Sequence, residues 1–230
     1  MDFTPVELVA IKLSLRVATV ATLASLPFGI AVAMLLARGR FAGRTLLDGL
    51  VHLPLVLPPV VTGYLLLIGF GRRGPIGAFL EQAFGIVFAF RWTGAALASA
   101  IMGFPLLVRA LRLSIEAVDR RLEDTAASLG AGRTIVFLTI TLPLILPGLL
   151  AGAVLAFAKA LGEFGATITF VSNIPGETQT IPTAIYTALQ VPGGEPAAIR
   201  LSIVAIIISL AALLLSEILA RNMRGKRAAA

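Results

Sequence analysis

The chain has 230 residues, of which 58% are hydrophobic and only 13% are charged. Soluble domains are about 45–50% apolar and about 25% charged, so a soluble protein is excluded and lipid must surround most of the chain. The net charge of +7 does not indicate a nucleic-acid binder, because the basic residues lie between apolar runs instead of gathering beside stacking aromatic residues. The absence of cysteine and the single histidine exclude a disulfide framework and a thiolate or histidine-rich metal centre.

The sequence contains five apolar runs with few charges, and the length of each is close to the about 20 residues that a helix needs to cross a bilayer. They do not alternate polar with apolar residues, so a β-barrel is not indicated. We therefore expect an all-α, polytopic bundle of five spans that forms a single transmembrane domain over residues 1–230. The fifth run reaches full length by including residues 197–199, with Arg200 snorkelling to the interface. The runs are residues 17–37, 49–71, 92–108, 134–158 and 201–216.

The first run is expected to be an uncleaved span, because it is longer than the about 7–15 apolar residues of a signal peptide. A cleavage-like sequence at residues 31–33 leaves removal of this segment as an alternative.

The basic residues between the runs predict the orientation, because cytoplasmic loops carry the excess of Lys and Arg. The N-terminus is therefore expected outside and the C-terminus in the cytoplasm. The side with twelve basic residues receives Arg38, Arg40, Arg44, Arg109, Arg112, Arg120, Arg121, Arg133, Arg221, Arg224, Lys226 and Arg227. The side with six receives Lys12, Arg16, Arg72, Arg73, Arg91 and Arg200.

The fourth span has two possible positions, because Pro143 and Pro147 interrupt the first half of its apolar run. We prefer a span over residues 146–171, with residues 134–145 lying along the cytoplasmic interface. Lys159 and Glu163 then stand four residues apart on one helix face, where they neutralise each other in lipid.

A long segment between the third and fourth spans is predicted to be an amphipathic helix ended by Gly130 in a left-handed cap. Two interpretations stay open: a helix resting on lipid headgroups, or a rigid element that a cytosolic partner binds. Its apolar stripe is Leu111, Ile115, Val118, Leu122, Ala126 and Leu129.

The same segment resembles the EAA loop of ABC-importer permeases, Glu-Ala-Ala, three residues, Gly, nine residues, Ile-x-Leu-Pro. The spacing is kept throughout, although Asp124 stands where that family has Glu and Thr125 where it has the first Ala. Glu123, one residue earlier, is a candidate for the longer carboxylate. The resemblance implies an ATPase-coupling loop at about residues 109–145. Its candidate residues are Glu123, Asp124, Thr125, Ala126, Gly130, Ile140, Leu142 and Pro143.

The resemblance extends over most of the chain to the molybdate permease subunits of the molybdate/sulfate group. Residues 52–64, HLPLVLPPVVTGY, are similar to the second span of such subunits. Residues 161–168, LGEFGATI, are similar to the group signature, and residues 173–178, NIPGET, to the external turn that follows it. The second-span sequence favours molybdate, with sulfate or tungstate as the alternative.

The resemblance implies a type I ABC-importer permease fold and transport by alternating access. It also implies the partners: a second copy of the chain, a cytosolic ABC ATPase dimer that binds ATP and Mg, and an extracytoplasmic molybdate-binding protein. The chain itself has no P-loop, because residues 39–45, GRFAGRT, are one residue too short and carry Arg in place of Lys. No catalytic residue and no cofactor is therefore expected here, and the location implied is the bacterial inner membrane.

Candidates for the transport pathway or its gate come from the second and fourth spans. The prolines of the second span either break it to open a cavity or produce a simple packing kink. Glu163 is either a structural partner of Lys159 or a part of the pathway. The candidates are Pro58, Pro59, Thr62, Gly63, Lys159, Glu163 and Thr167.

The external loops carry further candidates. Arg72, Arg73 and Arg91 either steer an oxyanion or its carrier to the mouth or are ordinary loop charges. Residues 182–190 are predicted to form a short external helix that caps the pore or meets the binding protein.

The sequence argues against two other classes of function. An ion-coupled secondary transporter using Lys159 and Glu163 predicts inverted repeats, and the sequence shows none. An intramembrane enzyme needs a metal-ligand or nucleophile–base cluster, and none is present in the sequence.

The charge distribution makes the topology testable with a reporter that is active only in the cytoplasm. Fusions after Gly43, within residues 119–133 or after Arg227 are expected to be active, and fusions after Pro75 or Gly193 to be silent. An active fusion after Pro75 would contradict the five-span topology.

Overall fold

The computed structural model describes residues 3–228, with side chains described to residue 218, and this part of the chain is helical without any strand. The elements are α1 (Pro5–Arg38), α2 (Arg44–Val56), α3 (Pro59–Phe70), α4 (Pro75–Phe84), α5 (Trp92–Glu116), α6 (Arg120–Ser128), α7 (Arg133–Val136), the π-helix η1 (Phe137–Thr141), α8 (Leu142–Leu161), α9 (Gly165–Val171), α10 (Ile181–Ala188) and α11 (Glu195–Ala228).

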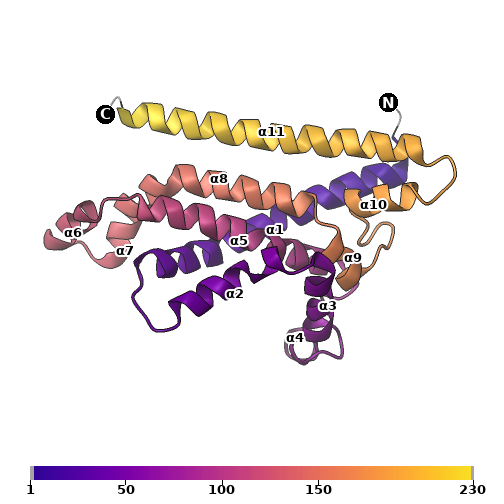
Figure 1. Ribbon diagram of the computed structural model, residues 1–230, viewed down its shortest axis with the longest axis horizontal. Coiled ribbons are helices and arrows are strands. Elements are labelled where there is room, and N and C mark those ends of the chain that lie inside the picture. The colour runs from indigo at the N-terminus through magenta and orange to yellow at the C-terminus, as the bar shows by residue number, and fades with distance from the viewer. Residues whose placement is uncertain (1–2, 229–230) are drawn as a thin grey trace.

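Helix α5 is the centre of the bundle and packs along both α1 and α8 (Figure 1). Its buried face consists largely of small side chains, which allow helix backbones to approach closely where lipid gives no hydrophobic driving force. Helix α11 lies along the outside of α8, and most of its apolar surface is exposed for lipid to cover. The small buried residues of α5 are Gly94, Ala95, Ala96, Ala98, Ser99 and Gly103.

Four helical segments are long and apolar enough to cross a membrane: Pro5–Arg38, Trp92–Glu116, Arg133–Leu161 and Glu195–Ile218. A fifth crossing is present if α2 and α3 form one broken span, because these two helices together pass the same test but bend by 114°. The expected all-helical architecture is therefore confirmed, with four or five spans.

The break between α2 and α3 follows from two adjacent prolines. Pro59 is the first residue of α3, and Pro58 before it is extended, with φ −54° and ψ 133°. A residue that precedes proline is disfavoured in helical conformation, so neither Leu57 nor Pro58 continues α2. The bend of 114° is a break in the helix, far sharper than the packing kink considered as an alternative.

The preferred position of the fourth span, residues 146–171, is wrong. The helix begins at Arg133, passes through the π-helical turn η1 and ends at Leu161, and a separate helix α9 follows the break at residues 162–164. Residues 134–145 are part of this long helix and do not form a separate interfacial segment. Proline is tolerated in the first turn of a helix and in a widened turn, so Pro143 did not end the helix.

The continuous amphipathic helix expected between the third and fourth spans is also wrong. Helix α5 runs on to Glu116, so Leu111 and Ile115 are core residues, and a new helix begins at Arg120. Asp119 starts α6 as its N-cap, with the carboxylate accepting from the backbone N–H of Arg121 at 2.9 Å.

The two ends of the elongated bundle carry different parts of the chain (Figure 1). Helix α6 and the C-terminal end of α11 lie at one end, whereas α10 and the N-terminal end of α1 lie at the other. Five crossings, counting α2 and α3 as one broken span, are compatible with this arrangement, and their number stays a prediction. Which end faces the cytoplasm stays a prediction.

Helices α3 and α9 cross at a contact that only glycine permits. A Cβ on Gly63 would lie 2.5 Å from the carbonyl oxygen of Ala166, and a Cβ on Gly165 would lie 2.7 Å from the Cβ of Pro59. Both distances are far below van der Waals contact, so the two backbones touch directly.

We expect Gly63→Ala to lower the free energy of unfolding by about 1–3 kcal/mol, because the added methyl group must push α3 away from α9. Gly49→Ala on α2 is the matched control, since a Cβ there has no neighbour within 4 Å and alanine is the better helix former. Thermal unfolding in detergent measures both. Equal unfolding temperatures for the two variants would contradict the close crossing.

Candidate functional site

The EAA-like segment forms an exposed helix with a defined end. No residue of α6 is buried, and Leu122 and Leu129 of its apolar stripe are exposed. After α6 the backbone N–H of Gly130 donates to Ala127 and that of Ala131 to Ala126, the paired bonds of a Schellman cap. Gly130 has a φ of +90°, so the left-handed cap predicted from the sequence is confirmed.

The two acidic candidates of α6 occupy different environments. Glu123 points into the protein, where its carboxylate pairs with Arg38 at 3.3 Å and accepts from the hydroxyl of Thr141 at 2.7 Å. Asp124 is exposed. Both line a cavity of about 440 Å³ beneath α6, to which Arg120 and Arg133 also contribute.

The remaining EAA-like residues are divided between the end of α6 and the long helix that follows. Thr125 is exposed and Ala126 is half-buried on α6, whereas Ile140 lies in η1 and Leu142 and Pro143 open α8. Only the first part of the pattern therefore forms a separate surface helix. The second part lies within the long helix that follows.

The π-helical turn lies directly before Pro143. Proline has no N–H to donate, and its ring clashes with the carbonyl four residues earlier, which belongs to Thr139. The turn widens accordingly, and the N–H of Leu142 bonds to the carbonyl of Phe137 instead of the one after it. Such widened turns occur frequently at functional sites.

The pathway candidates of the second and fourth spans come together at the crossing of α3 and α9. Pro59 and Gly63 contact α9 at Gly165 and Ala166, as described above. Thr62 is buried at this level of α3. Gly63 is buried with Thr62, whereas Pro58 and Pro59 are exposed, so the crossing packs two helices together and also reaches the surface of the chain.

Glu163 lies in the break between α8 and α9, buried to 2% exposure. Its carboxylate accepts from Lys159 Nζ at 3.1 Å and from the backbone N–H of Ala166 at 2.9 Å. The expected pairing with Lys159 is present, although the two residues do not share one helix. Thr167 is buried beside it, and its hydroxyl donates to the carbonyl of Phe164 at 2.9 Å.

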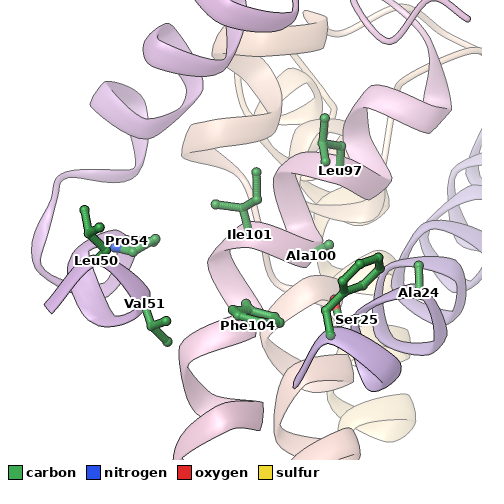
Figure 2. Close-up of a pocket in the computed structure, with 10 residues that line it drawn as sticks. Ala24, Ser25, Leu50, Val51, Pro54, Leu97, Ala100, Ile101 and Phe104 are labelled. Carbon is green, nitrogen blue, oxygen red and sulfur yellow. The ribbon is translucent and has the colours of Figure 1, made fainter. Parts of the chain in front are cut away.

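A cavity of about 470 Å³ separates α2 from α1 and α5 (Figure 2). The one hydroxyl side chain on its wall is that of Ser25, and it already donates to the carbonyl of Ala21 at 2.7 Å. The cavity is therefore unsuited to a charged ligand, and it leaves α2 with one buried residue, Val51. The lining residues are Ala24, Ser25, Phe28, Leu50, Val51, Pro54, Leu97, Ala100, Ile101 and Phe104.

An ion pair that the sequence analysis missed joins the first helix to the last. Arg200 donates to the carboxylate of Glu7 at 2.7 and 3.1 Å, and its expected snorkelling to the interface stays a prediction. Glu7 is held in place by a capping box with Thr4 at the start of α1. The pattern Thr-x-x-Glu before an apolar run was the signal that identifies this cap, but it does not identify the distant partner.

Two further cationic contacts tie helices together. Arg16 of α1 lies over the ring of Trp92 at 3.7 Å, at the start of α5. Arg112 of α5 pairs with Asp48 of α2 at 3.1 Å. Neither partner is near in sequence, so periodicity gave no signal for them.

The external candidates do not form one cluster. Arg72 and Arg73 are exposed beside a cavity of about 380 Å³, and Arg91 lines a second cavity of about 600 Å³ together with Glu177. The short helix predicted at residues 182–190 is present as α10, which packs through Ile181 against α1 and α11, and its external location stays a prediction.

We expect Lys159→Met to lower the free energy of unfolding by about 3–5 kcal/mol, because it leaves the buried carboxylate of Glu163 without its counter-charge. The double variant with Glu163→Gln is expected to recover most of this loss, since a neutral amide still accepts from Ala166. Thermal unfolding of both variants in detergent tests this. A double variant as unstable as Lys159→Met would contradict neutralisation as the basis of the pairing.

Comparison with known proteins identifies the family. The family described as "Binding-protein-dependent transport system inner membrane component" matches residues 25–225. The "Molybdenum transport system permease protein ModB" of Escherichia coli (strain K12) is 62% identical over 224 residues, 97% of this chain and 98% of that protein. ModB of Haemophilus influenzae is 60% identical over 96% of each chain. The "Sulfate transport system permease protein CysT" of Salmonella typhimurium is 39% identical over 81% of this chain and 67% of that protein.

Solved structures share the fold. A bacterial ABC transporter involved in the import of the acidic polysaccharide alginate gives a TM-score of 0.71 at 22% identity, over 94% of this chain and 80% of that chain. An amino acid ABC transporter gives 0.65 at 18% identity, over 96% of this chain and all of the other. With four or more apolar helices of membrane-spanning length, the chain is a multi-pass membrane protein. It belongs to the family of binding-protein-dependent transport system inner membrane components.

Proposed function

We propose that this chain is the transmembrane permease subunit of an ATP-driven importer of molybdate. The observation that supports molybdate as the substrate is the 62% identity to a molybdenum transport permease over nearly the full length of both proteins. The observation that supports the transporter class is the EAA-like segment, folded as an exposed, capped helix on a multi-pass bundle.

ATP hydrolysis belongs to a separate cytosolic ATPase dimer, which binds ATP and Mg. Helix α6, at one end of the bundle, is the element that this partner binds, with the exposed carboxylate of Asp124 as one contact. Closure of the ATPase then moves α6 and rocks the spans between outward-facing and inward-facing states.

The chain acts as a homodimer in the bacterial inner membrane, as one transmembrane domain of five spans per copy. The broken pair α2–α3 counts as one span, the N-terminus lies outside, and the segment at about residues 109–145 faces the cytoplasm. One copy encloses little of a pathway, because three of its polar pathway candidates, Thr62, Glu163 and Thr167, are buried within the chain and only Lys159 is partly exposed. Two copies around a common axis are therefore required for a central channel.

An extracytoplasmic molybdate-binding protein delivers the substrate and determines selectivity. Molybdate, tungstate and sulfate are tetrahedral dianions that differ in size and hydrogen bonding. A closed, desolvated site discriminates between such ions, because unmatched polar groups there carry a large penalty. A channel that must release its cargo cannot bind so tightly, so the permease mainly recognises the loaded binding protein.

Sulfate is the alternative substrate, and the similarity to a sulfate permease of Salmonella typhimurium supports it. That relative is 39% identical over 81% of this chain, against 62% over 97% for the molybdenum permease of Escherichia coli. The difference favours molybdate.

Cells that lack this chain are expected to lose high-affinity molybdate uptake and to recover molybdoenzyme activity when molybdate is supplied in excess. Uptake of labelled molybdate measures the first effect, and plasmid-borne expression of the chain is the control. Intact high-affinity uptake in the deletion strain would contradict the assignment.

Reconstituted complexes provide the complementary test of selectivity. Given a sulfate-loaded binding protein from a sulfate importer, they are expected to transport poorly, because the docking surfaces do not match. Rapid sulfate uptake under these conditions would favour the alternative.

A further inference from the structure

Three elements that are distant in sequence meet at one side chain beneath α6. The carboxylate of Glu123 binds the Arg38 guanidinium at the end of α1 through Oε2 and the Thr141 hydroxyl at the end of η1 through Oε1. Arg38 also donates to the carbonyl of Val118, in the junction between α5 and α6, at 3.1 Å. We name the three residues Arg38, Glu123 and Thr141 the α6 latch.

The latch residues are largely buried and bind one another. The side chains of Arg38 and Glu123 are 18% and 19% exposed, and Thr141 is 1% exposed. Both oxygens of the Glu123 carboxylate already have partners within the chain. The neighbouring Asp124 is the acidic residue that faces outward.

Among the residues that the structure describes, few other contacts fasten α6 to the bundle. All nine of its residues are at least partly exposed, and its main packing contacts are with the short α7 and with η1. A charge-assisted contact between largely buried side chains is therefore a principal tie between α6 and the spans.

One contact of the latch lies in η1, the turn of the long helix that is not α-helical. Thr141 is the last residue of η1, directly before the start of α8. A displacement of α6 pulls on this turn through Thr141 and on the end of α1 through Arg38. Both α1 and α8 pack along the central helix α5, so the displacement reaches the core of the bundle.

We propose that Glu123 is a positioning residue of the coupling element: it joins α6 to α1 and α8 through Arg38 and Thr141, while Asp124 is left for the partner. The proposal rests on the proposed function, because it assigns how movement of α6 reaches the spans. It replaces the interpretation of Glu123 as the carboxylate that contacts the ATPase.

The first test uses the permease alone and does not depend on transport. Hydrogen exchange of the α6 amides, measured by mass spectrometry in detergent, is expected to be about tenfold faster in Glu123→Gln than in the unmutated protein. Asp124→Asn is the matched control, because it removes the same charge one residue away but breaks no contact within the latch. Unchanged exchange in Glu123→Gln would overturn the proposal.

Substitutions of Thr141 distinguish an internal latch from a contact that docks the ATPase. Thr141→Val keeps the shape of the side chain and removes the donor, so it is expected to accelerate α6 exchange in the same direction as Glu123→Gln. Thr141→Ser restores the hydroxyl and is expected to return exchange to the unmutated rate. If Thr141→Val exchanged like the unmutated protein, Thr141 would have no part in holding α6 and the latch would be refuted.

The second test measures coupling in proteoliposomes that contain the permease, its ATPase and the loaded binding protein. Molybdate imported per ATP hydrolysed is expected to fall about tenfold in Glu123→Gln and Thr141→Val and to be preserved in Thr141→Ser. Faster α6 exchange with an unchanged ratio would overturn the coupling role. Absence of molybdate import by the unmutated complex would instead contradict the proposed function, and the exchange experiment would still decide the latch.

Discussion

The close approach of α5 to α1 and α8 depends on small side chains, because lipid tails are as apolar as the helix surfaces and do not drive them together. Small buried residues such as Ala98 and Gly103 lie in the first half of α5, and at Gly103 the backbone comes close to Ala156 of α8. Because the central helices pack tightly, the outer helices can pack less regularly. Helix α2 is separated from it by an apolar cavity, and α11 covers it from outside with most of its surface facing lipid.

Two breaks interrupt the helices of the bundle, one after α2 and one between α8 and α9. In lipid a broken helix exposes backbone groups that water cannot satisfy, so breaks are tolerated only against other protein. The break at residues 162–164 has its polar groups bound within the chain, because Glu163 accepts from Ala166 and Lys159. The break after α2 brings α3 against α9, so the two interruptions of the bundle are packed on one another.

Composition and run length were sufficient to predict an all-helical membrane protein, and periodicity was sufficient for α10. The Gly130 cap was predictable because it depends on local backbone chemistry alone. Helix ends near prolines were not, since Pro143 is accommodated by the widened turn η1 and does not end the helix. The orientation of Glu123 and the partner of Arg200 were not predictable either, because residues that pair across 85 and 193 positions produce no periodic pattern in the sequence.

The ion pair of Glu7 and Arg200 imposes an order on assembly. Glu7 enters the membrane with the first helix made, and its partner is synthesised 193 residues later with the last. All helices of the α1–α5–α8 bundle are therefore synthesised while this carboxylate still lacks its arginine. The contact between α1 and α11 at the end of the bundle that carries α10 can form only after Arg200 has been synthesised. A chain shortened before residue 200 would retain the central helices and keep that end open.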